Sequence, residues 1–243
     1  MKLVISLNLI IISFLICINP ANGEITITNK VQTNSTPPSA LTVNTSIPET
    51  SKQSVNSPIG IDWKPMFDGS SLAGWKITEF PGHSNVLVKE HLIILEAGND
   101  LTGITWTNPF PKMNYEVIID AARLDSSDFF CGITFPVGDS YCSFIPGGWG
   151  GHVVGISSIN GSDASQNETT KSMSFKKDRF YRFKIKVTEE KIEAWIDNIK
   201  FVDLVYKDRM LSTRLEMEYS KPFGIASWRT TGAISNIWFR IIK

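Results

Sequence analysis

The sequence predicts an all-β sandwich over residues 61–243. Three observations favour this fold class: short runs rich in β-branched and aromatic residues recur along the chain, clusters of Gly, Pro, Asn and Asp separate them, and no run keeps a helical period of 3.6. The segments with strand character cover 85–90, 91–97, 102–107, 115–124, 129–135, 141–145, 152–158, 171–175, 179–188, 191–197, 200–206, 223–228 and 233–242. Residues 208–219 form the one stretch with room for a helix.

Residues 1–23 have the pattern of a cleaved secretory signal. Lys2 precedes an apolar run over 3–18, and the small residues Ala21 and Gly23 stand where a signal peptidase recognises its substrate. The run is short for a membrane span and contains polar residues. We therefore expect a secreted, periplasmic or cell-envelope protein that has no membrane segment after signal cleavage.

Residues 24–60 predict a disordered linker. They are rich in Ser, Thr, Asn and Pro and almost free of aromatic residues, so they cannot bury enough apolar surface to offset the entropy of ordering. All seven tryptophans lie in 61–243, which is the size of one ordinary domain.

The charge balance excludes a polyanionic partner. The chain has 24 Lys and Arg and 24 Asp and Glu, and the two signs are interspersed. No basic stripe is present to neutralise phosphates, so we expect no nucleic-acid binding. The residues also show no phosphate loop and no metal-ligand spacing among the three histidines, and we expect neither cofactor nor metal. Composition leaves the oligomeric state open.

The clearest hairpin spans 180–197, with its turn centred on Glu189-Glu190. This centring aligns an apolar row on one face and complementary polar pairs on the other. The expected pairs are Phe183 with Ile196, Ile185 with Ala194, Val187 with Ile192, Arg182 with Asp197, Lys184 with Trp195, and Lys186 with Glu193. The polar face that carries Trp195 is either a solvated outer surface, which we favour, or part of a sugar-binding concavity.

Cys131 and Cys142 are the two cysteines beyond the signal. If Gly138-Asp139 closes a hairpin between their strands, Cys131 faces position 146, too far from Cys142 for a disulfide. We expect two buried free thiols, whereas a longer loop would allow a bridge.

Several motifs, taken in order, resemble the 3-keto-disaccharide hydrolase domain family. The domain opens with "FDGSSLAGW" (67–75), continues through "FFCGITF" (129–135) and "KIEAWIDNIKFVD" (191–203), and closes with "GIASWRTTGAISNIWFRI" (224–241). The stretch 131–170 resembles a divergent exported branch associated with planctomycete-type bacteria. The resemblance covers nearly the whole domain and implies a concanavalin A-like jelly roll of two antiparallel sheets.

The resemblance also implies an activity on carbohydrates. Characterised branches of the family cleave glycosidic bonds in sugars that carry a ketone at carbon 3. The ketone acidifies the neighbouring C–H, so a base can remove that proton and the aglycone can leave by elimination. Such chemistry needs a base and a group that stabilises the oxyanion.

The chain departs from the family pattern in two motifs. Many relatives have a Tyr-Glu-x-Gln strand where this chain reads "YCSFI", which places Cys142 and Phe144 near the expected Glu and Gln. The usual Gln-Asp-His-Gly turn becomes "SWRTTG" (227–232). These changes keep a second hypothesis open: a non-catalytic glycan-binding or cell-surface module on the same fold.

Trp149 and His152 are the first candidate site residues. Trp149 lies between two glycine pairs in "GGWGGH", so its ring could lie open and stack on a pyranose. The alternative is a buried indole at a tight sheet bend. His152 is a candidate proton carrier or a structural histidine.

Trp228 and Arg229 are the second pair of candidates. Arg229 either stabilises an enolate or forms a surface ion pair, and Trp228 offers a second stacking platform. Strand alternation places the two side chains on opposite faces unless a turn begins there. Asp163, in the polar loop 159–170, and Asp120 complete the predicted substrate-binding residues, although that loop is also consistent with plain solvation.

Overall fold

The structure is a computed structural model that describes residues 14–18, 25–29, 58, 60 and 62–243. The predicted signal (1–23) and linker (24–60) therefore lie mostly outside the described residues. Within them, β1 (Phe14–Ile18) pairs antiparallel with β2 (Ile25–Asn29). Among the described residues, no helix is both long and apolar enough to cross a membrane.

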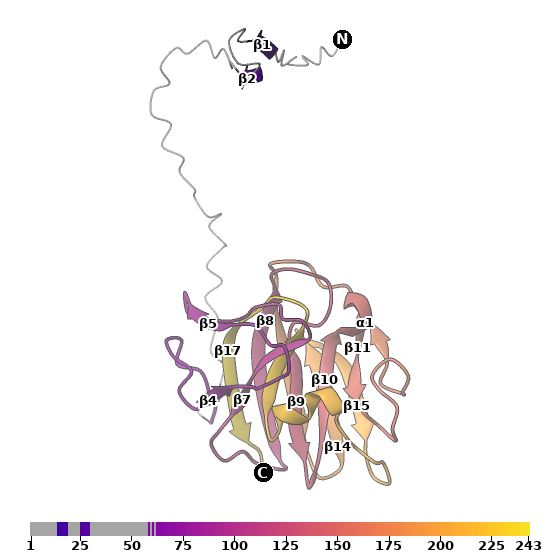
Figure 1. Ribbon diagram of the computed structural model, residues 1–243. Helices are drawn as coiled ribbons and strands as arrows, with labels where there is room; N and C mark the ends of the chain where they lie inside the picture. Colours follow the sequence, from indigo (N-terminus) through magenta and orange to yellow (C-terminus); the bar gives the residue numbers. More distant parts are fainter. Residues whose placement is uncertain (1–13, 19–24, 30–57, 59, 61) are drawn as a thin grey trace, which may run out of the picture. The chain divides into compact units, whose positions relative to one another are not determined.

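The second unit, Ser54–Lys243, consists of two antiparallel sheets (Figure 1). The seven-stranded sheet has the order β12 (Lys171–Ser172), β11 (Val153–Ser157), β10 (Ser140–Gly147), β9 (Gly132–Val137), β16 (Gly224–Trp228), β7 (Leu101–Trp106), β4 (Trp75–Ile77). The eight-stranded sheet has the order β15 (Ile199–Val205), β14 (Lys191–Ile196), β13 (Phe180–Val187), β8 (Tyr115–Arg123), β17 (Gly232–Ile241), β6 (Leu92–Leu95), β5 (Val86–Lys89), and β3 (Lys64–Pro65) pairs with β17.

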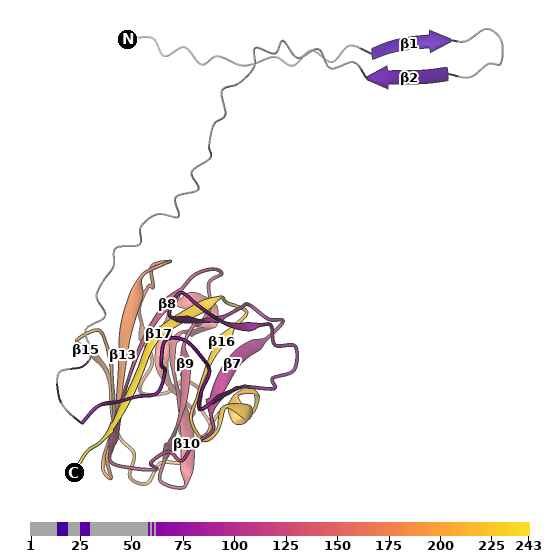
Figure 2. The same cartoon turned by 90° about the vertical axis from the view of Figure 1, so that its left-hand side faces the viewer.

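The two sheets form the two layers of a sandwich. Figure 2 shows β13 and β17 in one layer and β7 and β16 in the other. Strand alternation explains the core between them: along β13 every second side chain is buried, and Phe183 and Ile185 face inward. Phe144 on β10 and Ile225 on β16 meet them from the seven-stranded sheet. The predicted all-β sandwich is confirmed.

The predicted hairpin register is confirmed. Phe183 faces Ile196, and the pairing continues to Val187 and Ile192, with Lys184 beside Trp195 on the other face. The backbone nitrogen of Asp197 also donates a hydrogen bond to the carbonyl oxygen of Arg182, at 2.7 Å. Register could be predicted here because a two-residue turn and an alternating pattern fix it locally.

The cysteine prediction is confirmed as well. Gly138 and Asp139 separate Val137 from its partner Ser140, so the loop is as short as expected. Cys131 and Cys142 are free and buried, and burial raises the pKa of both thiols.

The helical content of the domain is small. The predicted stretch 208–219 overlaps the 3-10 helix η1 (Leu215–Ser220), which lies on the outer side of the seven-stranded sheet (Figure 2). A second short turn, α1 (Gly148–Gly151), follows β10 and contains Trp149. Both segments lie on the same sheet face, because Trp149 of α1 and Met217 of η1 line one cleft there.

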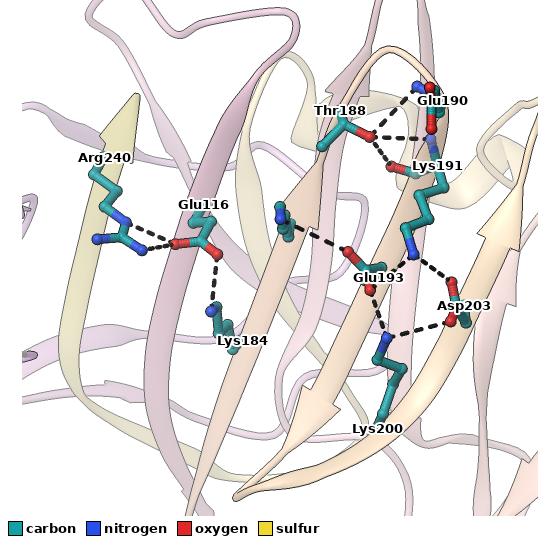
Figure 3. Close-up of polar contacts among 10 residues, drawn as sticks. Glu116, Lys184, Thr188, Glu190, Lys191, Glu193, Lys200, Asp203 and Arg240 are labelled. Carbon is teal, nitrogen blue, oxygen red and sulfur yellow. Dashed lines mark hydrogen bonds and ion pairs between the residues drawn. The ribbon is translucent and has the colours of Figure 1, made fainter. Parts of the chain in front are cut away.

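The outer face of the eight-stranded sheet carries a network of charged side chains (Figure 3). Glu116 forms ion pairs with Lys184, at 2.8 Å, and with Arg240, and its side chain is 4% exposed. Glu193 is paired with Lys191 and Lys200. The predicted outer position of Trp195 agrees with this arrangement, because the indole lies between Lys184 and Lys200, at 5.0 and 5.3 Å from its centroid.

Candidate functional site

A cleft of about 210 Å³ opens on the outer face of the seven-stranded sheet. It contains side chains from both ends of the domain sequence, which the sheet topology brings together. The residues that line it are Leu101, Asp128, Phe129, Ile145, Trp149, Ser157, Arg214, Glu216, Met217 and Trp228.

Strand alternation supplies the floor of the cleft. Ile145 and Ser157 each follow a core residue on their strands, so their side chains face away from the core. Leu101 and Trp228 lie opposite each other where β7 pairs with β16. Because Ile225 of β16 faces the core, three residues earlier, Trp228 faces outward.

The glycines around Trp149 build a left-handed turn that presents the indole. Gly147, Gly150 and Gly151 have φ of 83°, 86° and 107°, values that favour glycine. Trp149 itself has φ 51° and ψ 53°, an unusual conformation for an aromatic residue. The side chain is 37% exposed. The ring is therefore open, as the sugar-stacking alternative predicted. The chain also bends here, as the other alternative predicted, although the indole is not buried.

Asp128 is held in the cleft by backbone donors. The nitrogen of Gly150 donates to its Oδ2 at 3.0 Å, and the nitrogen of Phe129 donates to its Oδ1 at 2.8 Å. The hydroxyl of Thr230 accepts a hydrogen bond from the Asp128 nitrogen at 3.1 Å. These contacts link the carboxylate to the Trp149 turn and fix its orientation.

Arg214 lies beside the indole, with its guanidinium carbon 6.0 Å from the centroid of Trp149. It donates to Asp163 at 2.8 Å and to Glu216 at 2.9 Å. The hydrogen bond from Arg214 lowers the pKa of Glu216, although partial burial opposes the shift, and so keeps that carboxylate ionised. The guanidinium is thus fixed next to the exposed indole of Trp149.

The structure brings some of the predicted site residues together. Trp149 and Trp228 line the same cleft, and Asp163 contacts it through Arg214. His152 is exposed and does not line the cleft. Arg229 pairs with Asp100 at 2.7 Å on the surface, beside the ring of Trp228 at 5.3 Å.

Asp120 lies on the other sheet, away from the cleft. It is buried on the outer face of β8, where Arg182 and Asn236 donate to it at 2.7 and 2.8 Å. The two nitrogens of Arg182 bind the two carboxylate oxygens as a bidentate pair. This geometry is that of a cross-strand ion pair within the eight-stranded sheet.

Sequence reasoning missed Asp128, Phe129, Arg214 and Glu216. Asp128 lies in the connection between β8 and β9, and its side chain lines the cleft. One signal was available: Asp128 and Phe129 precede a strand whose partner ends in the Trp-Gly motif. Arg214 and Glu216 had no such signal, because their segment has no regular strand pattern.

In the first of the two motifs that depart from the family pattern (141–145), the departing positions face the core. Cys142 and Phe144 are fully buried between the sheets, whereas Ser143 and Ile145 face outward. A carboxylate at position 142 or 144 would therefore not enter the cleft in this chain. Among residues 62–243 and the other described residues, no group of three or more His, Cys, Asp and Glu is placed to hold a metal ion.

The two antiparallel sheets, packed face to face, form a jelly-roll sandwich with a cleft on one outer face. Residues 62–243 match the 3-keto-alpha-glucoside-1,2-lyase-like domain, and the chain belongs to this family. The resemblance noted from the sequence motifs is thereby confirmed. The search of curated proteins gave no match.

Three solved structures are similar to this chain at low identity, and the first of them, with a TM-score above 0.5, shares its fold. The Crh5 transglycosylase in complex with NAG is 11% identical, with a TM-score of 0.52 over 75% of this chain and 85% of that one. A putative glycosyl hydrolase from Parabacteroides distasonis is 10% identical, with a TM-score of 0.48 over 74% and 94%. The carbohydrate-binding module CBM66 from Bacillus subtilis is 10% identical, with a TM-score of 0.41 over 69% and 95%.

Proposed function

We propose that this member of a carbohydrate-active family binds a glycoside in the Trp149 cleft and cleaves it by elimination next to a ketone at carbon 3. The observation that carries the proposal is the cleft itself. It places an open indole, a guanidinium and an oriented carboxylate within one small cavity on the outer face of the seven-stranded sheet. The family to which the chain belongs supports the same substrate class.

Trp149 supplies the stacking platform for the sugar. An aromatic face binds the apolar face of a pyranose, and the Trp149 side chain is open to solvent. The cavity lies below the range of roughly 300 to 1,000 Å³ typical of drug-sized ligands, so it fits one sugar ring with its substituent rather than a long chain.

Asp128 and Arg214 supply the two groups that the elimination needs. The Asp128 carboxylate removes the proton from carbon 2, and the electron pair moves to the ketone oxygen as an enolate, which Arg214 stabilises. The pair then returns to expel the aglycone oxygen from carbon 1, and a double bond forms between carbons 1 and 2. The proton passes to the aglycone, so an enone and an alcohol are released.

This assignment differs from the roles predicted for His152 and Arg229. Asp128 and Arg214 line the cleft, whereas His152 and Arg229 do not. Turnover by His152→Ala and Arg229→Gln therefore separates the two assignments. We expect both variants to retain activity within about twofold.

Turnover of a 3-keto-glucoside tests the proposal. We expect Asp128→Asn to lower kcat by 100-fold or more, the usual contribution of a general base, while substrate binding changes little. We expect Trp149→Ala to weaken substrate binding about tenfold. The matched control is Trp195→Ala, which removes an indole on the opposite sheet. Unchanged kcat in Asp128→Asn would exclude the mechanism. Binding that depends on Trp149, without turnover of any 3-keto sugar by the wild type, would establish the glycan-binding module instead.

We also propose that the protein is exported and that its signal is cleaved after Gly23. The apolar run over 3–18 and the small residues before the cleavage point support the proposal. Intact mass of the protein recovered outside the cytoplasm is expected to correspond to a chain that starts at Glu24. A mature chain that starts at Met1 would contradict it.

A further inference from the structure

The residues that line the cleft differ in chemistry between its Trp149 end and its Trp228 end, and Phe129 packs against the apolar clusters of both. The polar groups gather around Trp149: Asp128 bonds to Gly150 of the same turn, and Arg214 lies over the indole. Glu216 joins this group through Arg214. The first end therefore carries the hydrogen-bonding groups that recognise sugar hydroxyls and a ketone.

The second end is apolar. Leu101 and Met217 are both buried and belong to one small hydrophobic cluster, against which Phe129 and Trp228 pack. The four side chains are held together by the structure: Leu101 faces Trp228 across the β7–β16 ladder, and the Trp228 nitrogen donates to the Phe129 carbonyl at 3.0 Å. Arg229, next in the chain, is engaged by Asp100 at the surface. This end offers an apolar surface and an indole.

We infer that the protein acts on glycosides whose aglycone is apolar, a carbocyclic or aromatic ring rather than a second sugar. This inference rests on the proposed function, because it assigns the polar end to the sugar ring and the adjoining apolar end to the group on carbon 1. A second sugar would bring hydroxyl groups against Leu101, Phe129 and Met217, which have no polar side-chain atom to bond them, and burying an unpaired hydroxyl costs free energy. Transfer of an apolar ring from water to this apolar surface is favourable in free energy.

The size of the cleft agrees with this division. About 210 Å³ is shared between the two ends, so a sugar ring at the Trp149 end leaves room for a compact group at the Trp228 end. The aglycone would lie against Trp228 and Phe129, the two side chains there that are not fully buried. These two residues are therefore the specificity-determining positions.

The experiment compares methyl and cyclohexyl 3-keto-glucosides, whose leaving alcohols have similar basicity, so that the ratio of their kcat/KM values reports contacts to the aglycone. We expect the wild-type protein to prefer the cyclohexyl compound at least tenfold, in line with the 10- to 200-fold effect of even one methylene in an apolar pocket. Trp228→Ala is expected to reduce that preference severalfold, and Trp195→Ala to leave it unchanged. Phe129→Ala, with folding checked by thermal melting, is the second variant.

The outcomes separate the inference from the function on which it rests. Turnover of both glucosides with no preference, or a preference that survives both Trp228→Ala and Phe129→Ala, overturns the inference and leaves the function standing. A preference for a 3-keto disaccharide overturns it too. If neither glucoside is turned over, the proposed mechanism fails. The ratio of the dissociation constants of the same two compounds then tests the inference in place of the kcat/KM ratio.

Discussion

Trp149 shows how single residues build the cleft. Its own left-handed backbone and the glycines on both sides turn the chain so that the indole leaves the sheet surface. A conformation that costs of order 1–3 kcal/mol persists only where neighbouring structure enforces it, and such residues concentrate at functional sites. Here the enforcing contact is the bond from the Gly150 nitrogen to Asp128.

Gly151 is needed for close approach as well as for its φ. A Cβ at this position would collide with the carbonyl oxygen of Ser127, whereas a Cβ on Gly150 would meet open space. We expect Gly151→Ala to lower the free energy of unfolding by about 1–3 kcal/mol more than Gly150→Ala, which has only the backbone strain. Urea unfolding of the two variants measures the difference. Equal losses would contradict the role of the Ser127 contact.

The family's opening motif has a structural explanation at the same scale. Asp68 accepts hydrogen bonds from the backbone nitrogens of Ser70 and Ser71, both at 2.7 Å, and so closes the turn. The indole nitrogen of Trp75 donates to the carbonyl of Met66 at 2.6 Å. The motif thus fastens the start of the domain to its core and contributes no group to the cleft.

At the scale of elements, two segments meet at Arg214. The loop 158–170 supplies Asp163 and the 3-10 helix supplies Glu216, and both pair with the guanidinium. Asp128 lines the same cleft, so three carboxylates and one cation lie in or beside it. The sugar end of the cleft is therefore net negative, which disfavours anionic ligands.

This charge balance predicts discrimination between sugars of the same shape. A glucuronide is expected to bind several-fold more weakly than the matching glucoside at low ionic strength, and the gap is expected to narrow in high salt because salt screens the repulsion. Isothermal titration of the two ligands at two salt concentrations measures it. Tighter binding of the glucuronide would show that Arg214, rather than its carboxylate partners, dominates the field.

The strands β14 and β15 carry a pH-dependent element. Burial raises the pKa of Glu193, but bonds from Lys200 and Lys191 outweigh it, so the pKa lies below its usual value near 4.5. A carboxylate with a lowered folded-state pKa stabilises the fold above the unfolded value, and that contribution is lost as the pH falls through the lowered pKa. We expect Glu193→Gln to reduce stability at pH 7 and to flatten its decline below about pH 4.5. Urea midpoints from pH 7 to pH 3 test this, and parallel curves for the two proteins would contradict it.

At the scale of the whole molecule, the two cysteines report on global unfolding. Both thiols are fully buried in the core between the sheets, and burial raises their pKa, so little reactive thiolate is present. We expect neither Cys131 nor Cys142 to react with a thiol reagent in the native protein at pH 8, and both to react together in denaturant. Mass spectrometry counts the modified thiols. Fast labelling of one cysteine in native buffer would reveal a local opening of β9 or β10.

The sequence alone determined the fold class and the local pairings, for a physical reason. Alternation and turn chemistry are short-range, so the 180–197 hairpin and the Gly138-Asp139 turn could be predicted residue by residue. The same short-range information favoured an open Trp149. Family resemblance then indicated the substrate class from ordered motifs.

Only the tertiary structure decided which side chains share a cleft. Leu101, Asp128, Trp149, Arg214 and Trp228 are far apart in the sequence and meet because β7, β16, β9 and β10 are neighbours in one sheet. Strand order is a long-range property that no local pattern encodes. The tertiary structure places Asp120 on the other sheet and Arg214 beside Trp149. This arrangement determines which chemical groups the cleft contains.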